Sequence, residues 1–249
     1  MDRSFLSHPA VVAESRKFVC IRLATYESAA EAEVLKAALT TRSGQLENTV
    51  FALLAPDGKT PLVRSGRMAR ESVGEAEEGA RRMAELASQH PGAAPIGGAL
   101  PLLADLRRGL NVAACELQPL VVIAARTEEG RKKIEESLLR FVWRPETAGR
   151  FGFARATPAE AATVLEGVVE GDGIFVVQPD AFGLKGKVLT FGVGSDREGM
   201  RTAMARGLEA FRAEAKDSKK HIDEGVRRGL NWTTEIPVTD PRSPRREKR

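Results

Sequence analysis

The sequence predicts an α/β protein in which two similar units follow one another along the chain. Apolar stretches of strand length alternate with amphipathic stretches of helix length through most of the 249 residues. The same order of elements occurs once before residue 90 and once after residue 118. Between them, the run HPGAAPIGGALP (residues 90–101) has the composition of a linker or turn region. The chain is long enough for two ordinary domains.

In the first half, the composition of residues 9–17 predicts a helix, and KFVCIRL (17–23) predicts a strand. The stretch SAAEAEVLKAALTT (28–41) carries apolar residues at helical spacing. The stretch NTVFALLAPDGKTPLVRSGR (48–67) predicts a hairpin, since a Pro-Asp-Gly turn separates two strand-like runs. A charged amphipathic helix, ESVGEAEEGARRMAELASQ (71–89), closes this half.

The second half opens with PLVVIAAR (119–126), whose continuous apolar run is typical of a strand covered on both faces. A helix is predicted over 127–142, with Thr127 as its N-cap and acidic residues in its first turn. Next come a short strand, FGFARA (151–156), and a short helix with proline at its start (157–168). A hairpin with a Pro-Asp turn (173–194) and a final helix (196–215) complete this half.

A repeated pentapeptide is consistent with duplication of one unit. RRGLN occurs at 107–111 and again at 227–231, each time after the closing helix of a unit. The alternative is that these are two unrelated helix ends that both contain glycine. The sequence therefore predicts a first domain over 1–89, a linker with a helix over 90–117, a second domain over 118–215 and a basic C-terminal extension over 216–249.

The stretch SFLSHPAVVAESRKFVCIRLA (4–24), together with the hairpin after it, resembles the thioredoxin-like superfamily. A β-α-β half followed by a β-hairpin and a helix is the layout of that fold. The resemblance implies an α/β protein of two tandem thioredoxin-like domains, with mixed central sheets flanked by helices. In this family a CxxC motif stands just upstream of the matching stretch. The first domain as given would lack both that motif and its first strand.

Redox activity needs a thiolate of low pKa at a helix N-terminus and a second thiol to resolve the mixed disulfide. The chain has two cysteines, Cys20 and Cys115, which stand far apart in apolar contexts that predict burial. Where the resemblance would place a second CxxC, Ala125 to Lys132 read ARTEEGRK, which holds two acids and no thiol. At the helix start, Thr127 to Gly130, the two glutamates would repel an anion. The family's cis-proline is also missing, because the corresponding positions are Asn48 or Thr49 and Gly173.

These observations predict no catalytic residue, no cofactor-binding residue and no metal ligand. The three histidines, His8, His90 and His221, form no cluster with cysteine or carboxylate at metal-ligand spacing. The leading hypothesis is a non-catalytic thioredoxin-fold interaction or scaffold protein. One alternative is a thiol-disulfide oxidoreductase whose CxxC lies upstream of residue 1, so the enzyme question stays open and leans towards no. A second alternative is binding to an anionic surface or nucleic acid through the basic tail.

The expected partner is another protein or a second copy of this chain, held by an arm around Trp232 in GLNWTTEIPVTDP (229–241). Nucleic acid is not favoured. Residues 216–249 hold ten Lys or Arg and six Asp or Glu, a surplus of four that equals the net charge of the chain. The aromatic run FVWRPETAGRFGF (141–153) is interpreted as core packing with surface arginines rather than as a stacking platform. No apolar run is long enough to span a membrane. The chain as given is expected in the cytoplasm, or outside it if an upstream signal has been removed.

Overall fold

The structure is a computed structural model that describes residues 5–21, 23, 28–38, 50–91, 99–144, 146–213 and 216–230. The chain divides into two compact units, with the boundary after residue 95. Unit 1 is described up to residue 91, and unit 2 from residue 99 to residue 230. Each unit is described by itself below.

Unit 2 is a mixed α/β structure built on a five-stranded sheet with the order β2-β1-β4-β5-β3. The strands β1 and β2 are parallel, β4 is antiparallel to both β1 and β5, and β3 is parallel to β5. The strand bounds are β1 Leu120–Ala124, β2 Gly152–Ala156, β3 Leu165–Glu166, β4 Gly173–Pro179 and β5 Gly186–Val193. The expectation of an α/β fold with a mixed sheet is confirmed at this level.

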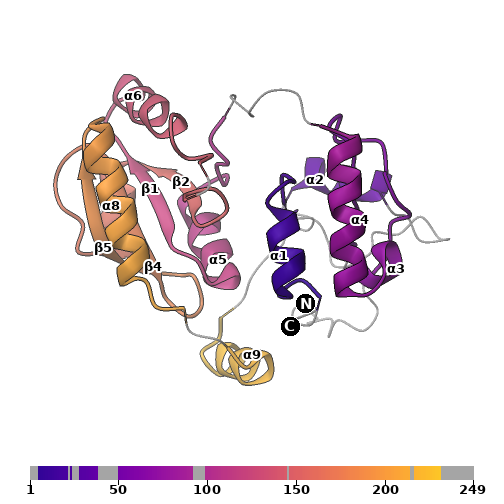
Figure 1. Cartoon of the computed structure of the whole chain (residues 1–249). Coiled ribbons are helices and arrows are strands. Elements are labelled where there is room, and N and C mark those ends of the chain that lie inside the picture. The colour runs from indigo at the N-terminus through magenta and orange to yellow at the C-terminus, as the bar shows by residue number, and fades with distance from the viewer. Residues whose placement is uncertain are drawn as a thin grey trace. The chain divides into compact units, whose positions relative to one another are not determined.

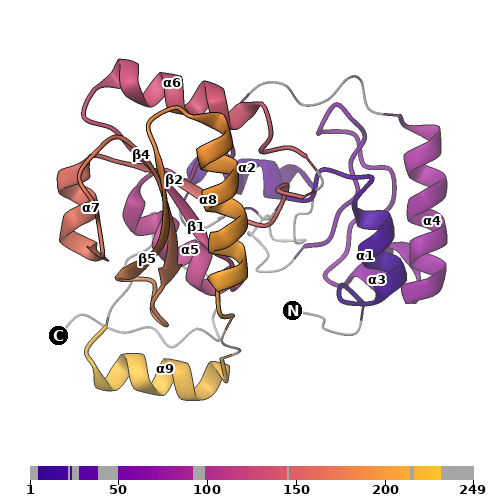
Figure 2. The same cartoon turned by 60° about the vertical axis from the view of Figure 1, so that its left-hand side comes forward.

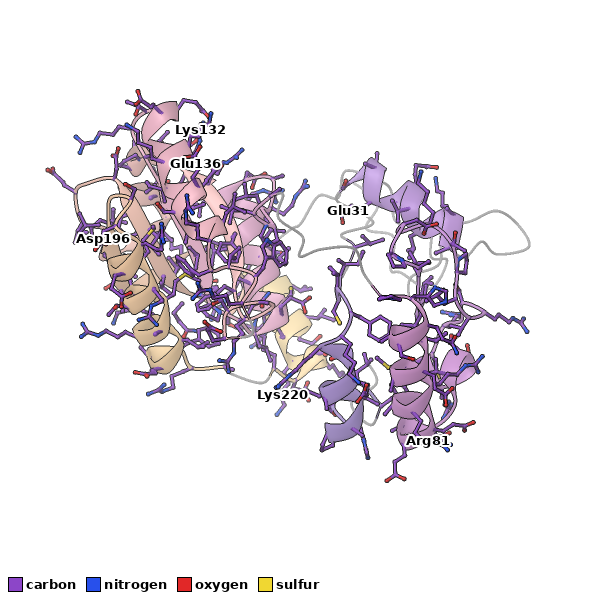
Figure 3. All side chains as sticks on the ribbon, turned by 45° about the horizontal axis from the view of Figure 1, so that its top comes forward. Glu31, Arg81, Lys132, Glu136, Asp196 and Lys220 are labelled. Atoms are coloured by element: carbon purple, nitrogen blue, oxygen red, sulfur yellow. The ribbon has the colours of Figure 1, made fainter. Side chains whose placement is uncertain are left out.

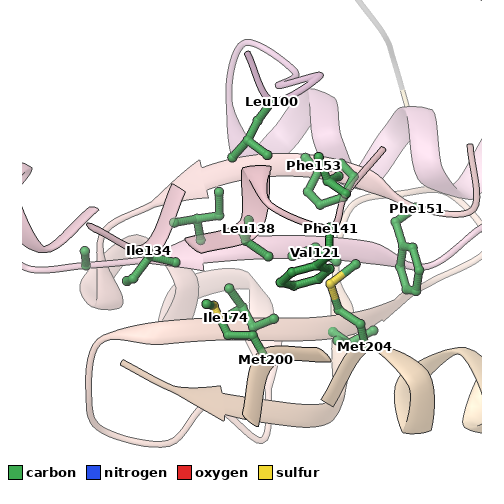
Figure 4. Close-up of a cluster of buried hydrophobic side chains, with 14 residues drawn as sticks. Leu100, Val121, Ile134, Leu138, Phe141, Phe151, Phe153, Ile174, Met200 and Met204 are labelled. Carbon is green, nitrogen blue, oxygen red and sulfur yellow. The ribbon is translucent and has the colours of Figure 1, made fainter. Parts of the chain in front are cut away.

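Helices cover both faces of this sheet, and Figures 1 and 2 show α8 and α5 on opposite sides of it. One face packs against α6 and α8, whose buried side chains form a single cluster with alternate residues of β1 and β4 (Figure 4). The other face packs against α5 and α7. The helix bounds are α5 Leu106–Glu116, α6 Glu128–Leu139, α7 Pro158–Val164 and α8 Arg197–Ala210. The sheet is therefore the middle of three layers.

The central strand β1 shows why its sequence is apolar throughout. All five of its residues are fully buried, because alternate side chains enter the two clusters on opposite faces of the sheet. Val121 and Ile123 face α6 and α8, while Leu120, Val122 and Ala124 face α5. The prediction of a strand buried on both faces is confirmed.

Most elements predicted for the second half lie where the sequence placed them. Thr127 caps α6 as expected, since its hydroxyl oxygen accepts a hydrogen bond from the Gly130 amide at 3.1 Å. Thr157 and Glu160 form a capping box on α7, whose first residue is Pro158. The helix that the sequence placed in the linker is α5, and it packs onto the sheet of unit 2.

A further helix, α9 (Ser218–Arg227), lies in the stretch that the sequence analysis described only as a basic extension. Asp217 caps it by accepting a hydrogen bond from the Lys220 amide. The helix rests on Phe182, whose ring is stacked with the ring of His221 at 4.3 Å between centroids. This helix could not be recognised from the sequence because most of its residues are polar or charged. Ile222 and Val226 are its large apolar side chains, and both are exposed.

The two copies of RRGLN take different positions in their helices. Residues 107–111 lie inside α5, where Gly109 approaches Ala154 of β2 so closely that a Cβ would lie 2.7 Å from the Ala154 Cβ. In the second copy, Arg227 ends α9 and Gly229 has a φ of 69° just beyond it. The repeat therefore does not mark equivalent places in two units, and it is not structural support for duplication.

Unit 1 contains four helices among its described residues and a small core. Phe5, Val11, Leu53, Val73 and Met83 are buried together there. The bounds are α1 Pro9–Ser15, α2 Ala29–Ala38, α3 Ala69–Val73 and α4 Ala76–Gln89. The helix predicted over 71–89 is interrupted at Gly74, whose φ is 90°. Helices were correctly predicted at α1 and α2.

The strand predicted over KFVCIRL is wrong for the described residues of that stretch. Residues 17–21 and 23 form turns and irregular backbone. Val19 is 59% exposed and Ile21 is 68% exposed, so the apolar run does not enter a sheet. Alternation of apolar residues favours a strand only when a partner strand is present, and none pairs with these residues in the described part of the chain.

The hairpin predicted over 48–67 is present as a turn with two isolated antiparallel bridges, Phe51↔Gly66 and Leu54↔Pro61. Residues 48 and 49 lie outside the described residues. The turn is held by Asp57, whose carboxylate accepts hydrogen bonds from the Lys59 amide and from both the amide and the hydroxyl of Thr60. These bonds lower the pKa of Asp57 from 3.8 to about 2, and the bond from the Thr60 hydroxyl has the largest effect.

We expect the Asp57 carboxyl to titrate with a midpoint of about 2 in an NMR titration of the full chain. Because the folded pKa is below the ordinary value of 3.8, the ionised form stabilises the turn. Its contribution is complete above the ordinary pKa and is lost as the pH falls through about 2. Thr60→Val should raise the Asp57 pKa towards 3.8, whereas Thr163→Val in unit 2 should leave it unchanged. An Asp57 midpoint that stays the same in Thr60→Val would contradict this account of the turn.

No helix in the described part of the chain is long and apolar enough to cross a membrane. Charged side chains extend outward from the helices of both units, as Lys132 and Glu136 on α6 and Arg81 on α4 illustrate (Figure 3). These helices therefore present charged faces to solvent.

Candidate functional site

The candidate site lies where β1 ends and α6 begins, the place where the sequence analysis looked for a redox motif. After the buried Ala125, the chain turns outward through Arg126 and Thr127, and α6 starts at Glu128. Thr127 has extended backbone angles (φ −125°, ψ 152°), the usual geometry of an N-cap residue. The first turn of α6 directs backbone amides towards this corner of the sheet.

Asp172 fills the corner from the neighbouring strand. It directly precedes β4, and its Oδ1 accepts hydrogen bonds from both the backbone amide and the Nε of Arg126, each at 3.2 Å. Its carbonyl oxygen accepts from the Gly194 amide at 2.7 Å, which fixes the backbone at the open end of the β4–β5 hairpin. The chain thus places one of its own carboxylates beside the N-terminus of α6.

Gly130 lets this carboxylate come close. A Cβ at position 130 would lie 3.0 Å from Oδ2 of Asp172 and 3.1 Å from the Thr127 hydroxyl oxygen. Gly173 makes a similar close approach, because a Cβ there would lie 2.1 Å from the carbonyl oxygen of Gly192. Gly130 therefore leaves room for the Asp172 side chain, and Gly173 lets the backbones of β4 and β5 come close. Gly173 occupies the position where the family resemblance implied a cis-proline.

The charged side chains around the start of α6 are paired with one another. Glu128 pairs with Arg131, and Glu129 pairs with Lys133 at 2.7 Å. The hydrogen bond and the charge of Lys133 lower the pKa of Glu129. Carboxylates at a helix N-terminus are favourable in themselves, and three of them already lie here. The arrangement stabilises the start of α6, and an external anion or thiolate would have to displace Asp172.

The expectation that both cysteines are buried is wrong. Cys20 and Cys115 are each exposed free thiols. Neighbouring atoms still remove part of the water around the Cys20 sulfur, which raises the pKa of that thiol. Cys115 lies near the end of α5, the helix on the face of the sheet opposite α6.

The aromatic run of residues 141–153 is core, as the sequence analysis interpreted it. Phe141, Phe151 and Phe153 are between 2% and 6% exposed and lie in the cluster beneath α6 and α8 (Figure 4). Trp143 packs against the same cluster. Arg144 and Arg150 point to solvent, as expected for surface arginines. The rings are therefore not accessible for stacking on bases.

No group of three or more histidine, cysteine or carboxylate side chains gathers at metal-binding distance in the described part of the chain. The His221 ring is instead stacked on the Phe182 ring. Its pKa is lowered, mainly because neighbouring atoms desolvate the ring and to a smaller extent because of the charge of Lys216. Trp232 and the tail after it lie outside the described residues, so the arm and the tail binding remain predictions.

No family model matches the chain, and no curated protein and no solved structure shows significant similarity to it.

Asp172 was not among the residues singled out from the sequence. Arg126 and Asp172 are 46 positions apart, so no local spacing relates them. A single aspartate between two glycines looks like a turn residue, and only the pairing of β1 with β4 brings it to α6.

Proposed function

We propose that this protein is a non-catalytic interaction module built on a thioredoxin-like sheet in unit 2. The order β2-β1-β4-β5, with β4 antiparallel to its neighbours, supports the fold assignment. So does the succession β1-α6-β2 and β4-β5-α8, which corresponds to a β-α-β half followed by a hairpin and a helix. A thioredoxin-like unit 1 remains a prediction from the sequence, since its described residues form bridges rather than strands.

The functional proposal rests on which residues lie at the start of α6. Thiol-disulfide exchange needs a thiolate stabilised there and a second thiol beside it. Thr127 and Gly130 stand at the spacing of a CxxC pair, and the carboxylate of Asp172 lies close to Gly130. A corner with these residues lacks the thiols that the exchange needs, which supports binding as the role of this sheet.

An insulin-reduction assay of the full chain tests the absence of catalysis. We expect no acceleration over dithiothreitol alone, and no difference between the natural chain and a Cys20→Ser, Cys115→Ser double variant. Turnover that depends on either cysteine would overturn the proposal.

A gain-of-function variant tests the platform. Thr127→Cys with Gly130→Cys installs a CxxC pair at the N-terminus of α6, and Asp172→Ala makes room for it. We expect this triple variant to form a reversible disulfide and to reduce insulin measurably. The matched control, Glu128→Cys with Arg131→Cys and Asp172→Ala, keeps the spacing but moves the pair one position along the helix, and it should be inactive. Equal activity of the two variants would contradict a thioredoxin-like placement of α6.

A further inference from the structure

The two outer edges of the sheet in unit 2 differ in how they are covered. Beside β2, Leu102 forms a parallel bridge to Phe153, and the Leu103 amide donates to the Phe153 carbonyl oxygen. At the other edge, β3 pairs only with Gly186 and Lys187 at the start of β5. No described strand pairs with Val188–Val193 on the side away from β4. An unpaired strand edge is a template for an added strand.

The loop after β3 passes close to β5, since a Cβ at Gly167 would lie 3.7 Å from the Val188 Cβ, but it does not pair with that strand. Val168 packs into the cluster on the α5 face, beneath the sheet. Among the described residues, no backbone hydrogen bond joins residues 167–171 to β5. A bulge leaves Leu189 without a partner on β4, because Val176 pairs with Thr190 and Val177 with Val188. The regular part of the open edge is therefore Thr190–Val193, enough for a short added strand.

A groove runs beside this edge, between β5 and α8, which lies over the same end of the sheet in Figures 1 and 2. Its volume is about 400 Å³, and its walls include Thr190 and Phe191 from β5 and Glu198, Thr202 and Arg206 from α8. The Thr190 hydroxyl donates to the Ala203 carbonyl oxygen at 2.7 Å, which fixes the wall between strand and helix. The side chains of an added strand that point towards α8 would enter this groove.

The charges of the groove favour an acidic occupant. Glu198 is held by Arg201 through two hydrogen bonds, at 2.6 and 3.1 Å. Arg206 is exposed, and it makes no hydrogen bond or ion pair with any described residue. The groove therefore presents one uncompensated guanidinium, whose planar donors suit a carboxylate. A second copy of the chain would bring the same Arg206 to this groove, so charge does not favour self-pairing.

We infer that the groove between β5 and α8 binds an extended acidic peptide segment of a partner protein, which adds as a strand along Thr190–Val193 and pairs a carboxylate with Arg206. The backbone of β5 supplies the hydrogen bonds, and Arg206 supplies the preference for an acidic sequence. The inference rests on the proposed function, because it gives the interaction module its binding surface and the chemistry of its partner.

The test uses the full chain and three synthetic peptides, with affinities measured by NMR titration. The first peptide, TVEVEVT, is acetylated and amidated, the second is TVKVKVT, and the third is TVEVEVT with alternate amides N-methylated. We expect the first peptide to bind and to shift the amide signals of Thr190–Val193 and of α8. The lysine peptide should bind at least about tenfold more weakly, as expected for the reversal of a charge beside Arg206. The methylated peptide should lose binding, since it cannot form the ladder.

Two variants separate the groove from general electrostatics. Arg206→Glu should lower the affinity for the acidic peptide by about tenfold or more and raise the affinity for the lysine peptide, because it reverses the charge beside the groove. Arg140→Glu makes the same charge change at the exposed end of α6 and should leave both affinities unchanged.

Three peptide results would overturn the inference: no binding of the acidic peptide, equal binding of the lysine peptide, or undiminished binding of the methylated peptide. So would a dimer in sedimentation equilibrium whose formation shifts the amide signals of Thr190–Val193. In each case, an inactive chain in the insulin assay would leave the proposed function standing. Cysteine-dependent turnover in that assay would instead remove the proposed function itself.

Discussion

Phe175→Ala is expected to lower the free energy of unfolding of unit 2 by about 4 kcal/mol, because truncation of a buried phenylalanine removes apolar burial and leaves a cavity. Phe175 lies in the middle of β4, is fully buried, and pairs with Val122 of β1 on one side and with Phe191 of β5 on the other. Its ring is stacked on that of Phe191, with centroids 4.9 Å apart and planes 26° apart. The loss is therefore a large part of the stability of an ordinary domain, about 5–15 kcal/mol.

The measurement is guanidinium unfolding followed by Trp143 fluorescence, in a Trp232→Phe background so that the signal reports the core of unit 2. Leu184→Ala is the control in the same hairpin, since Leu184 is 42% exposed. It should cost well under about 1 kcal/mol, as surface truncations usually do. Phe175→Leu should lie between the two, because it keeps most of the buried volume. A loss for Phe175→Ala no larger than that of Leu184→Ala would contradict the placement of β4 at the centre of the sheet.

The second half of the chain could be predicted because its local signals agree with its packing. In β1, five consecutive apolar residues between two helical stretches fit a strand covered on both faces, and all five are buried. Thr127 was expected to cap α6 and a proline was expected at the start of α7, and the structure has both. In such elements the local preference and the tertiary environment agree.

The failures come from places where a local pattern lacked its long-range partner. Val19 and Ile21 alternate as in a strand, yet no described strand pairs with them, and both are exposed. Cys115 follows three small apolar residues in the sequence, but it falls on the outer side of α5, where the helical period and not the local composition decides burial.

The candidate site and the groove depend on contacts between distant parts of the chain. Asp172 reaches Arg126 only because β4 pairs with β1, and Arg206 flanks Thr190 only because α8 returns over β5. Neither residue stands in a motif, so a sequence read alone gives no reason to select it. For the same reason, the stretch around Thr127 to Gly130 gives no sign in the sequence that the carboxylate of Asp172 lies beside it.

Gly183→Ala is expected to destabilise unit 2 by about 3 kcal/mol, because it combines a left-handed backbone position with a backbone clash. Gly183 has a φ of 65° in the turn between β4 and β5. The Asp180 carboxylate organises this turn by accepting from the amides of Phe182 and Leu184 at 3.0 Å each. A Cβ at position 183 would lie 2.4 Å from the Cα of Asn111 in α5. Since that neighbour is backbone, no change of rotamer relieves the contact, and the turn must lift away from the helix.

Gly194→Ala is the matched control, because Gly194 also has a positive φ, 57°, but no described neighbour lies within 4 Å of the place that an alanine methyl would take there. It should cost only about 1 kcal/mol, the strain of an alanine in the left-handed region. The difference between the two losses, measured by the same fluorescence-monitored unfolding, isolates the contact between the turn and α5. Equal losses would mean that the turn can move without disturbing α5, and would contradict the packing of the β4–β5 hairpin against that helix. A larger loss for Gly183→Ala would make this contact the anchor that fixes the turn end of β5, the strand whose other half borders the groove.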